Sequence, residues 1–159
     1  MDSKRRYWAA AMLSLGAFLF LFAGAALAGS TDVMVGVKHE MKAQIFVPDG
    51  PGPFPGVLVL HTSGGLQPAD TAFAERLAKE GYVALVPAFL DAYGITARTR
   101  RESFTTDAEQ IYADLAASVE TLRHEPKVAG GKVGAVGFSN GGYFAMWLAA
   151  TGKVDAGVS

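Results

Sequence analysis

The feature that most constrains this chain is a serine flanked by glycines, placed where an apolar strand would pass directly into an apolar helix. The segment Val133–Tyr143 has the form Gly-x-Ser-x-Gly at Gly137, Ser139 and Gly141. A strand that turns at once into a helix strains the backbone of its middle residue, and side chains two positions away on either side would collide. Glycine at both positions relieves that crowding. The pattern therefore predicts a sharp turn that exposes the Ser139 hydroxyl above the end of a sheet.

Such a turn suits a nucleophilic serine, because the helix that follows supplies free amide donors and a positive dipole end for a developing oxyanion. The alternative is a chance match in a glycine-rich chain, and the strand before and helix after argue against it. Two nucleotide-binding motifs fail on single residues. A dinucleotide fingerprint needs glycine where Ser139 stands, and a phosphate-binding P-loop needs Ser or Thr where Val133 follows Gly131-Lys132.

The hydrophobic pattern from Ser30 onward predicts six strands. Period-two alternation is typical of half-buried antiparallel strands at a sheet edge, and continuous apolar runs are typical of strands buried on both faces. The alternating strands are expected over 33–37 and 41–47, and the buried ones over 56–60, 82–87, 132–136 and 154–158. The proline- and glycine-rich stretch Pro48–Pro55 is expected to be a loop.

Three helices are expected between the strands. The first follows Asp70 as its N-cap, the second opens with a capping box of Thr106 and Glu109, and the third runs from Asn140 to Thr151. The second helix carries an apolar stripe at helical spacing: Ala108, Ile111, Leu115, Val119 and Leu122. Strands separated by helices imply right-handed crossovers, so the predicted class is α/β, with a mostly parallel sheet of about six strands and helices on both faces.

A second informative segment, His61-Thr62-Ser63-Gly64-Gly65, follows the first buried strand. An oxyanion hole at a serine turn of this kind takes one amide from the residue after the nucleophile and one from such a loop. We therefore expect the Asn140 amide as the first donor and that of Ser63, or its neighbour Thr62, as the second. The two glycines let the loop lie close over the site. An ordinary glycine turn with a structural histidine is the alternative.

From about Val33 to Ser159 the chain resembles the dienelactone hydrolase family of α/β-hydrolases. The resemblance rests on the early strand pair, the Pro-Gly loop, the strand into His61 with its Gly64-Gly65 loop, the run Gly137-Phe138-Ser139-Asn140-Gly141-Gly142, and the closing Val154–Ser159. It implies an α/β-hydrolase fold and hydrolysis of carboxylic esters or lactones, with no cofactor and no metal.

Two positions depart from the founding members of that family. Those enzymes use a cysteine nucleophile, where this chain has Ser139, and they carry a glutamate in the oxyanion loop, where this chain has Thr62. The two differences agree with each other, because that glutamate serves the thiol. They favour a serine esterase of the same family.

All three histidines of the chain precede Ser139, whereas the α/β-hydrolase triad is ordered serine, acid, histidine. His61 is expected to shape the oxyanion loop, and His124 to satisfy carbonyls at a helix end. The one later acid, Asp155, falls at the start of a strand rather than in a loop. The expectation is an incomplete α/β-hydrolase domain over 30–159 that is inactive alone, with its triad acid and histidine further along.

Residues 1–28 have the three parts of a secretory signal: a basic start at Lys4–Arg6, an apolar run from Trp8, and the small-residue ending Ala26-Leu27-Ala28. Cleavage there would leave an exported protein, periplasmic or secreted. The run is also long enough to span a bilayer, so a membrane anchor with the domain outside the cytoplasm is the alternative. The chain has no cysteine, which excludes disulfides, thiolate metal sites and a cysteine nucleophile.

The sequence thus favours an exported serine hydrolase in which Ser139 attacks the carbonyl and the Ser63 and Asn140 amides hold the oxyanion. Its partner would be a small ester or lactone, and the formal net charge of −1 gives no electrostatic footprint for nucleic acid. The sequence pattern does not indicate whether the protein is a monomer or an oligomer. The alternative function is a non-catalytic protein that uses the fold to bind a ligand or partner, or an inactive fragment.

Overall fold

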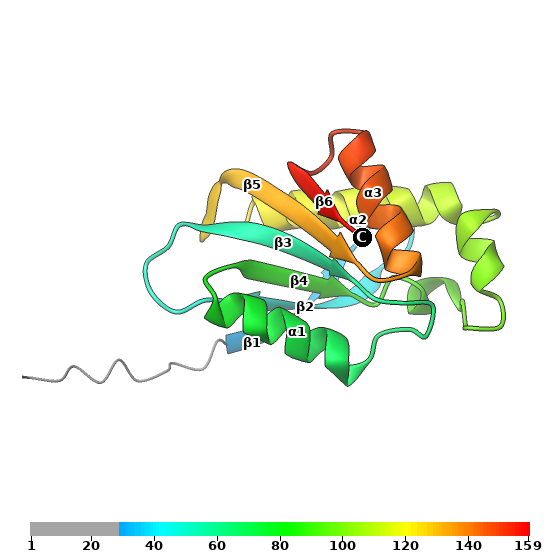
Figure 1. Cartoon of the computed structure of the whole chain (residues 1–159), viewed down its shortest axis with the longest axis horizontal. Helices are drawn as coiled ribbons and strands as arrows, with labels where there is room; N and C mark the ends of the chain where they lie inside the picture. Colours follow the sequence, from blue (N-terminus) through cyan, green and yellow to red (C-terminus); the bar gives the residue numbers. More distant parts are fainter. Residues whose placement is uncertain (1–28) are drawn as a thin grey trace, which may run out of the picture.

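The computed structural model describes residues 29–159, so the predicted leader over 1–28 lies outside the described residues. Figure 1 shows the described part as one twisted sheet with helices packed against it. The elements in chain order are β1 (Gly29–Val35), β2 (Met41–Val47), β3 (Phe54–Leu60), α1 (Pro68–Lys79), β4 (Val83–Pro87), the 3-10 helices η1 (Asp91–Tyr93) and η2 (Arg100–Phe104), α2 (Ala108–Arg123), β5 (Val128–Gly137), α3 (Asn140–Ala150) and β6 (Ala156–Val158).

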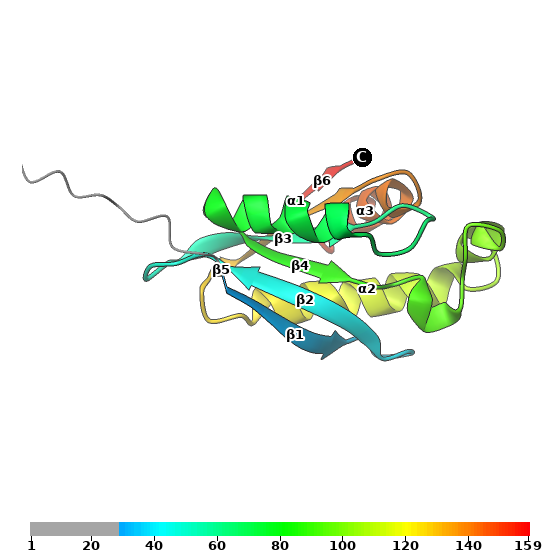
Figure 2. The ribbon, with the colours of Figure 1, turned by 90° about the horizontal axis from the view of Figure 1, so that it is seen from below.

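The sheet has six strands in the order β1-β2-β4-β3-β5-β6. The pairs β1–β2 and β2–β4 are antiparallel, whereas β4, β3, β5 and β6 run parallel to one another. Helix α1 lies on one face of the sheet and α2 on the other (Figure 2), and α3 packs into the same apolar core as α2. This arrangement confirms the predicted α/β class, with an antiparallel pair at one edge.

Two apolar cores lie on the two faces of the sheet. On the larger side, α2 fully buries the stripe expected from the sequence: Ile111, Leu115, Val119 and Leu122. On the other side, Ala74 and Ala78 of α1 pack against the strands. The alternation of side chains along β2 explains the division, because Ile45 points into the first core and its neighbour Phe46 into the second.

The start of α1 differs from the prediction. The N-cap is Gln67 and the helix begins at Pro68, so Asp70, predicted as the N-cap, lies in the first turn. There the Asp70 carboxylate accepts a hydrogen bond from the Gln67 amide at 2.8 Å. Proline lacks an amide hydrogen and suits the first helical position, where that hydrogen would have no helical partner. The helix can therefore begin three residues earlier than an N-cap at Asp70 predicts.

The predicted capping box of α2 is wrong. The helix begins at Ala108 with Asp107 as its N-cap, and Thr106 and Glu109 form no reciprocal pair. The preceding 3-10 helix η2 decides this start, because the Asp107 amide donates to the Glu102 carbonyl at 3.0 Å. Packing before the helix therefore overrides the local capping signal.

Strand β3 begins at Phe54, inside the stretch that was expected to be a loop, and includes Pro55. The Phe54 amide donates to the Lys127 carbonyl at 2.7 Å, and the pairing with β5 changes register between Phe54 and Gly56. A proline is tolerated at such an irregularity because no ladder hydrogen bond is required of it there. The strand therefore starts two residues before the apolar run that predicted it.

Strand β1 ends at Val35, two residues before its predicted end, because a buried carboxylate captures the chain that follows. Asp114 of α2 is fully buried. Its two oxygens accept hydrogen bonds from the three consecutive amides of residues 37–39, at 2.5–2.9 Å, and from the Tyr93 hydroxyl at 2.6 Å. The loop between β1 and β2 is thereby fastened to α2 and η1.

These contacts fix the charge states of the two side chains. Burial by itself raises the pKa of a carboxyl, but the hydrogen bonds from Tyr93 and from the amides of 37–39 outweigh it and hold the pKa of Asp114 below its ordinary value. Burial, followed by the bond to Asp114, raises the pKa of Tyr93. Asp114 is therefore a carboxylate at neutral pH, and Tyr93 is a neutral donor to it.

Candidate active site

The predicted turn from strand to helix is present at Ser139. Strand β5 ends at Gly137 and helix α3 begins at Asn140. Ser139 has φ 53° and ψ −109°, and among residues 29–159 it is the one non-glycine residue with a positive φ. Residues other than glycine rarely adopt this backbone conformation, and the strain persists only where the surrounding structure imposes it.

The two motif glycines lie where any side chain would meet backbone. A Cβ at Gly137 would collide with the carbonyl of Gly141, and a Cβ at Gly141 would collide with the carbonyl of Leu60 at the end of β3. Backbone atoms in packed strands and helices cannot move aside as a flexible side chain can. The close approach of β3, β5 and α3 therefore requires both glycines, as the sequence pattern predicted.

The loop after β3 lies directly against this turn. The Gly141 amide donates to the His61 carbonyl at 3.2 Å, which joins α3 to the loop. Within the loop, the Gly65 amide donates to the Thr62 carbonyl at 3.2 Å, and Gly65 has a φ of 78° that favours glycine. The structure therefore brings together the segment 61–65 and the turn at Ser139, which are far apart in the sequence.

Two backbone amides at this junction are free. Among the described residues, neither the Asn140 amide nor the Ser63 amide has a hydrogen-bond acceptor. The Ser139 side chain is exposed. An exposed hydroxyl beside unpaired amides is the donor arrangement that can stabilise a tetrahedral intermediate of acyl transfer.

His61 is fully buried under the loop and stacks on Phe89, with ring centroids 4.3 Å apart. Burial lowers its pKa, so the ring is neutral at neutral pH. Its Nδ1 lies 2.7 Å from the Thr62 carbonyl, which can only accept a hydrogen bond, so Nδ1 carries the proton. This bond ties the ring to the backbone of the loop, and no hydrogen bond joins His61 to Ser139.

The other candidate acid and base groups of the described residues lie elsewhere. His124 Nδ1 lies 2.7 Å from the Glu120 carbonyl at the end of α2, which confirms its predicted helix-end role. Asp155 accepts a hydrogen bond from the Val133 amide at 2.9 Å and lies 3.7 Å from the Arg123 guanidinium. Val133 lies in the middle of β5, six positions before Ser139, so Asp155 is bonded away from the carboxyl end of the strand that carries the serine turn.

One part of the site has no signal in the sequence pattern. The 3-10 helix η2 packs on the turn: Ser103 accepts a hydrogen bond from the Asn140 side chain, and the Phe104 ring meets Tyr143 edge-on at 5.1 Å. Phe104 also lines a recess of about 340 Å³ with Arg98, Arg100 and Arg101. Residues 98–104 have no hydrophobic periodicity and match no motif. Only the tertiary packing shows that they lie against the turn at Ser139.

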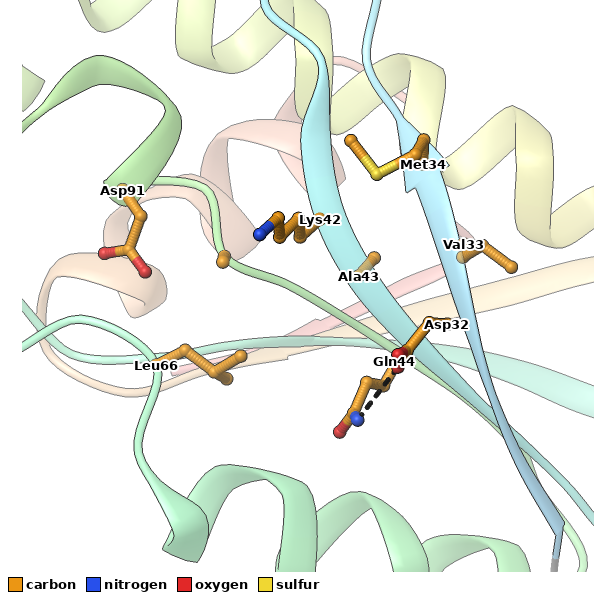
Figure 3. A pocket seen from close by; sticks show the side chains of 9 residues that line it. Asp32, Val33, Met34, Lys42, Ala43, Gln44, Leu66 and Asp91 are labelled. Carbon is orange, nitrogen blue, oxygen red and sulfur yellow. Dashed lines mark hydrogen bonds between the residues drawn. The ribbon is translucent and has the colours of Figure 1, made fainter.

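A larger cavity of about 630 Å³ adjoins the far end of the same loop. It is lined by residues of β1 and β2, by Leu66 and by the segment after β4, and Figure 3 shows Lys42 and Asp91 on either side of it. A Cβ at Gly65 would lie 3.2 Å from the Asp91 carboxylate, so the cavity wall touches the loop.

Within residues 29–159, no group of three or more His, Cys, Asp and Glu side chains is placed to hold a metal ion. The helices of the described part are also too short or too polar for any of them to cross a membrane.

Comparison with known proteins places this geometry in a family. Residues 41–159 match the model of the dienelactone hydrolase family. A Synechocystis sp. protein whose name proposes a carboxymethylenebutenolidase is 34% identical over 119 residues, covering 68% of this chain and 48% of that protein. A dienelactone hydrolase-like promiscuous phosphotriesterase from metagenomic libraries matches with a TM-score of 0.70 and 27% identity, over 80% of this chain and 56% of that one.

The dienelactone hydrolase of Anabaena variabilis has a similar structure as well, with a TM-score of 0.60 and 26% identity, over 79% of this chain and 59% of that one. The chain spans about half the length of the relatives that it matches. The family match includes both the loop 61–65 and the turn at Ser139. On this evidence, the chain belongs to the dienelactone hydrolase family.

Proposed function

We propose that this protein is a serine hydrolase of carboxylic esters or lactones, with Ser139 as its nucleophile. The observation that carries the proposal is the strained, exposed serine beside the free amides of Asn140 and Ser63. Membership of the dienelactone hydrolase family supports hydrolysis as the reaction class. The serine in place of the family's founding cysteine, and Thr62 in place of its glutamate, favour simple esters over dienelactones.

In the proposed reaction, the Ser139 oxygen attacks the carbonyl carbon of the ester and loses its proton to a general base. The Asn140 and Ser63 amides donate to the oxygen that becomes negative, and each such donor is worth about 2.7–4 kcal/mol of transition-state stabilisation. Collapse breaks the bond to the alcohol, which leaves with a proton. Water then attacks the acyl-serine, releases the acid and restores the hydroxyl.

The base in this scheme is a histidine, held by an acid, from outside residues 29–159. Within those residues His61 is neutral, fully buried and bonded to the loop, and Asp155 is bonded to the middle of β5, six positions before Ser139. Residues 30–159 alone are therefore expected to be inactive. The non-catalytic alternative remains the rival, since a chain without the base could use the same fold for binding.

The first test is the hydrolysis of p-nitrophenyl acetate by the protein expressed from its native coding sequence. Ser139→Ala should reduce kcat by roughly 10⁶-fold, as loss of a nucleophile does in a serine protease. His61→Ala should reduce it far less, because His61 supports the loop without contacting Ser139. Loss of activity in His61→Ala as complete as in Ser139→Ala would make His61 the base. Full activity in a folded Ser139→Ala variant would refute the assignment of Ser139 as the nucleophile.

We also propose that the protein is exported and that residues 1–28 are a cleaved signal peptide. The proposal rests on the basic start, the apolar run and the Ala26-Leu27-Ala28 ending. Amino-terminal sequencing of the protein from fractionated cells should find Gly29, or a residue close to it, outside the cytoplasm. Met1 retained in the membrane fraction would establish the anchor instead.

A further inference from the structure

The 3-10 helix η2 is fastened to the turn at Ser139 by one buried hydrogen bond. The Asn140 Nδ2 donates to the Ser103 Oγ at 2.7 Å, across 37 positions of sequence. Ser103 is fully buried and Asn140 is 2% exposed, so water does not compete for the bond. A buried polar side chain that loses its partner cannot turn to solvent. Breaking a buried hydrogen bond therefore costs more free energy than breaking one at the surface.

The direction of this bond is fixed by a second one. The Ser103 hydroxyl has a single proton, and that proton goes to the Arg100 carbonyl at 2.6 Å. Ser103 can therefore only accept from Asn140, which sets the Asn140 amide with its nitrogen toward η2. Among the described residues, Asn140 Oδ1 has no partner. Ser103 is thus the one described residue that holds the Asn140 side chain.

Asn140 is also the residue whose backbone amide follows the nucleophile. The direction of that amide depends on the ψ of Ser139 and the φ of Asn140, and Ser139 is held in a strained region. A side chain anchored to η2 restrains the backbone of Asn140. A hydrogen-bond donor stabilises an oxyanion only if it already points at the place where charge develops.

We propose that Ser103 is a positioning residue, which acts through the Asn140 side chain to aim the Asn140 amide at the oxyanion. This inference rests on the proposed function, because it assumes that Ser139 is the nucleophile. Ser103 itself touches no reacting atom. Its hydrogen bond joins the arginine-bearing segment 98–104 to the nucleophile turn, so this segment, which no motif marks, becomes part of the catalytic framework.

The test compares Ser103→Ala with wild type in the protein expressed from its native coding sequence. The variant should reduce kcat for p-nitrophenyl acetate by roughly 10- to 100-fold, since small misplacements of a catalytic group have effects of this size. KM should stay within about twofold, because the amide acts on the transition state more than on the bound ester. Ser103→Thr, which keeps the hydroxyl, should recover most of the kcat.

Ser118→Ala is the matched control. Ser118 is equally buried and also donates to a backbone carbonyl, that of Asp114 at 2.8 Å, but it lies in α2 away from the turn. Both alanine variants should lose similar stability, whereas only Ser103→Ala should lose kcat. Asn140→Ala keeps the backbone amide and removes its anchor, so it should show the same kcat loss, and the double variant with Ser103→Ala should lose little more.

Three results would overturn the positioning role: an unchanged kcat in Ser103→Ala, an equal kcat loss in Ser118→Ala, or additive losses in the double variant. If Ser103→Ala does not fold, Asn140→Ala decides, and an unchanged kcat there refutes the proposal. A wild-type protein without esterase activity would refute the proposed function itself. The two failures are therefore distinguishable.

Discussion

Among single residues, the geometry of the candidate site depends on how closely the backbones approach around Ser139. Sequence reasoning could predict this part, because the requirement for Gly137 and Gly141 follows from sterics alone. It could not predict the hydrogen bond from Asn140 to Ser103, since the partners are 37 positions apart and Ser103 belongs to no recognisable motif. Local geometry can be predicted from the sequence where close packing leaves no room for a side chain. It cannot be predicted where it depends on a partner far away in the sequence.

Gly137→Ala tests the close approach. The added Cβ would collide with the Gly141 carbonyl, so we expect the free energy of unfolding to fall by about 3 kcal/mol or more, as in other overpacked or strained sites. Gly134→Ala is the control from the same strand, because its Cβ would lie at an ordinary 3.5 Å from the Ala156 carbonyl. Urea unfolding measures both. Equal stability of the two variants would show that the turn has more room than the structure gives it.

At the scale of elements, the strands and helices follow their hydrophobic periods, and their ends follow tertiary contacts. The α2 stripe was predicted correctly because burial on one helix face requires it. The end of β1 was predicted wrongly because Asp114, a charged residue within that helix, binds the amides of 37–39. A buried carboxylate with four donors has no signature in a period-based analysis, since a charge in an amphipathic helix is normally assigned to its solvent face.

Asp114→Asn tests this anchor. The substituted amide would place an NH₂ group against donors, so we expect a loss of roughly 3–5 kcal/mol in the free energy of unfolding, as for other broken buried charge networks. Asp32→Asn is the control, because Asp32 is exposed and bonded only to the Gln44 side chain. Asp32→Asn should change the free energy of unfolding by no more than about 0.5 kcal/mol, as at ordinary surface sites. If Asp114→Asn has an equally small effect, the carboxylate charge is not what fastens the loop.

The same group gives the protein a pH dependence of stability. The pKa of Asp114 is lower in the folded chain than in the unfolded one, so its contribution is present above the unfolded value of about 4 and is lost as the pH falls toward the folded value. Wild type should therefore lose stability below about pH 5 more steeply than Asp114→Asn does. Parallel curves for the two proteins in urea titrations between pH 3 and pH 7 would contradict the assignment.

At the scale of the whole molecule, the parallel strands explain why distant segments form one site. Strands β3 and β5 are neighbours and run in the same direction, so the loop after one and the turn after the other meet at the same edge of the sheet. Topology rules could predict this meeting from the alternation of strands and helices. They could not place η2 there, because the connection from β4 to α2 has no regular pattern, and its position is set by packing against α3.

The most direct measurement is to identify by mass spectrometry the residue that a fluorophosphonate labels in the folded protein, expressed from its native coding sequence. We expect one adduct, on the peptide that contains Ser139, and we expect it to be absent after unfolding in urea and absent from Ser139→Ala. An adduct on another residue, or labelling that persists in the alanine variant, would contradict the central claim that Ser139 is the nucleophile. A folded wild-type protein that is not labelled at all would favour the non-catalytic alternative.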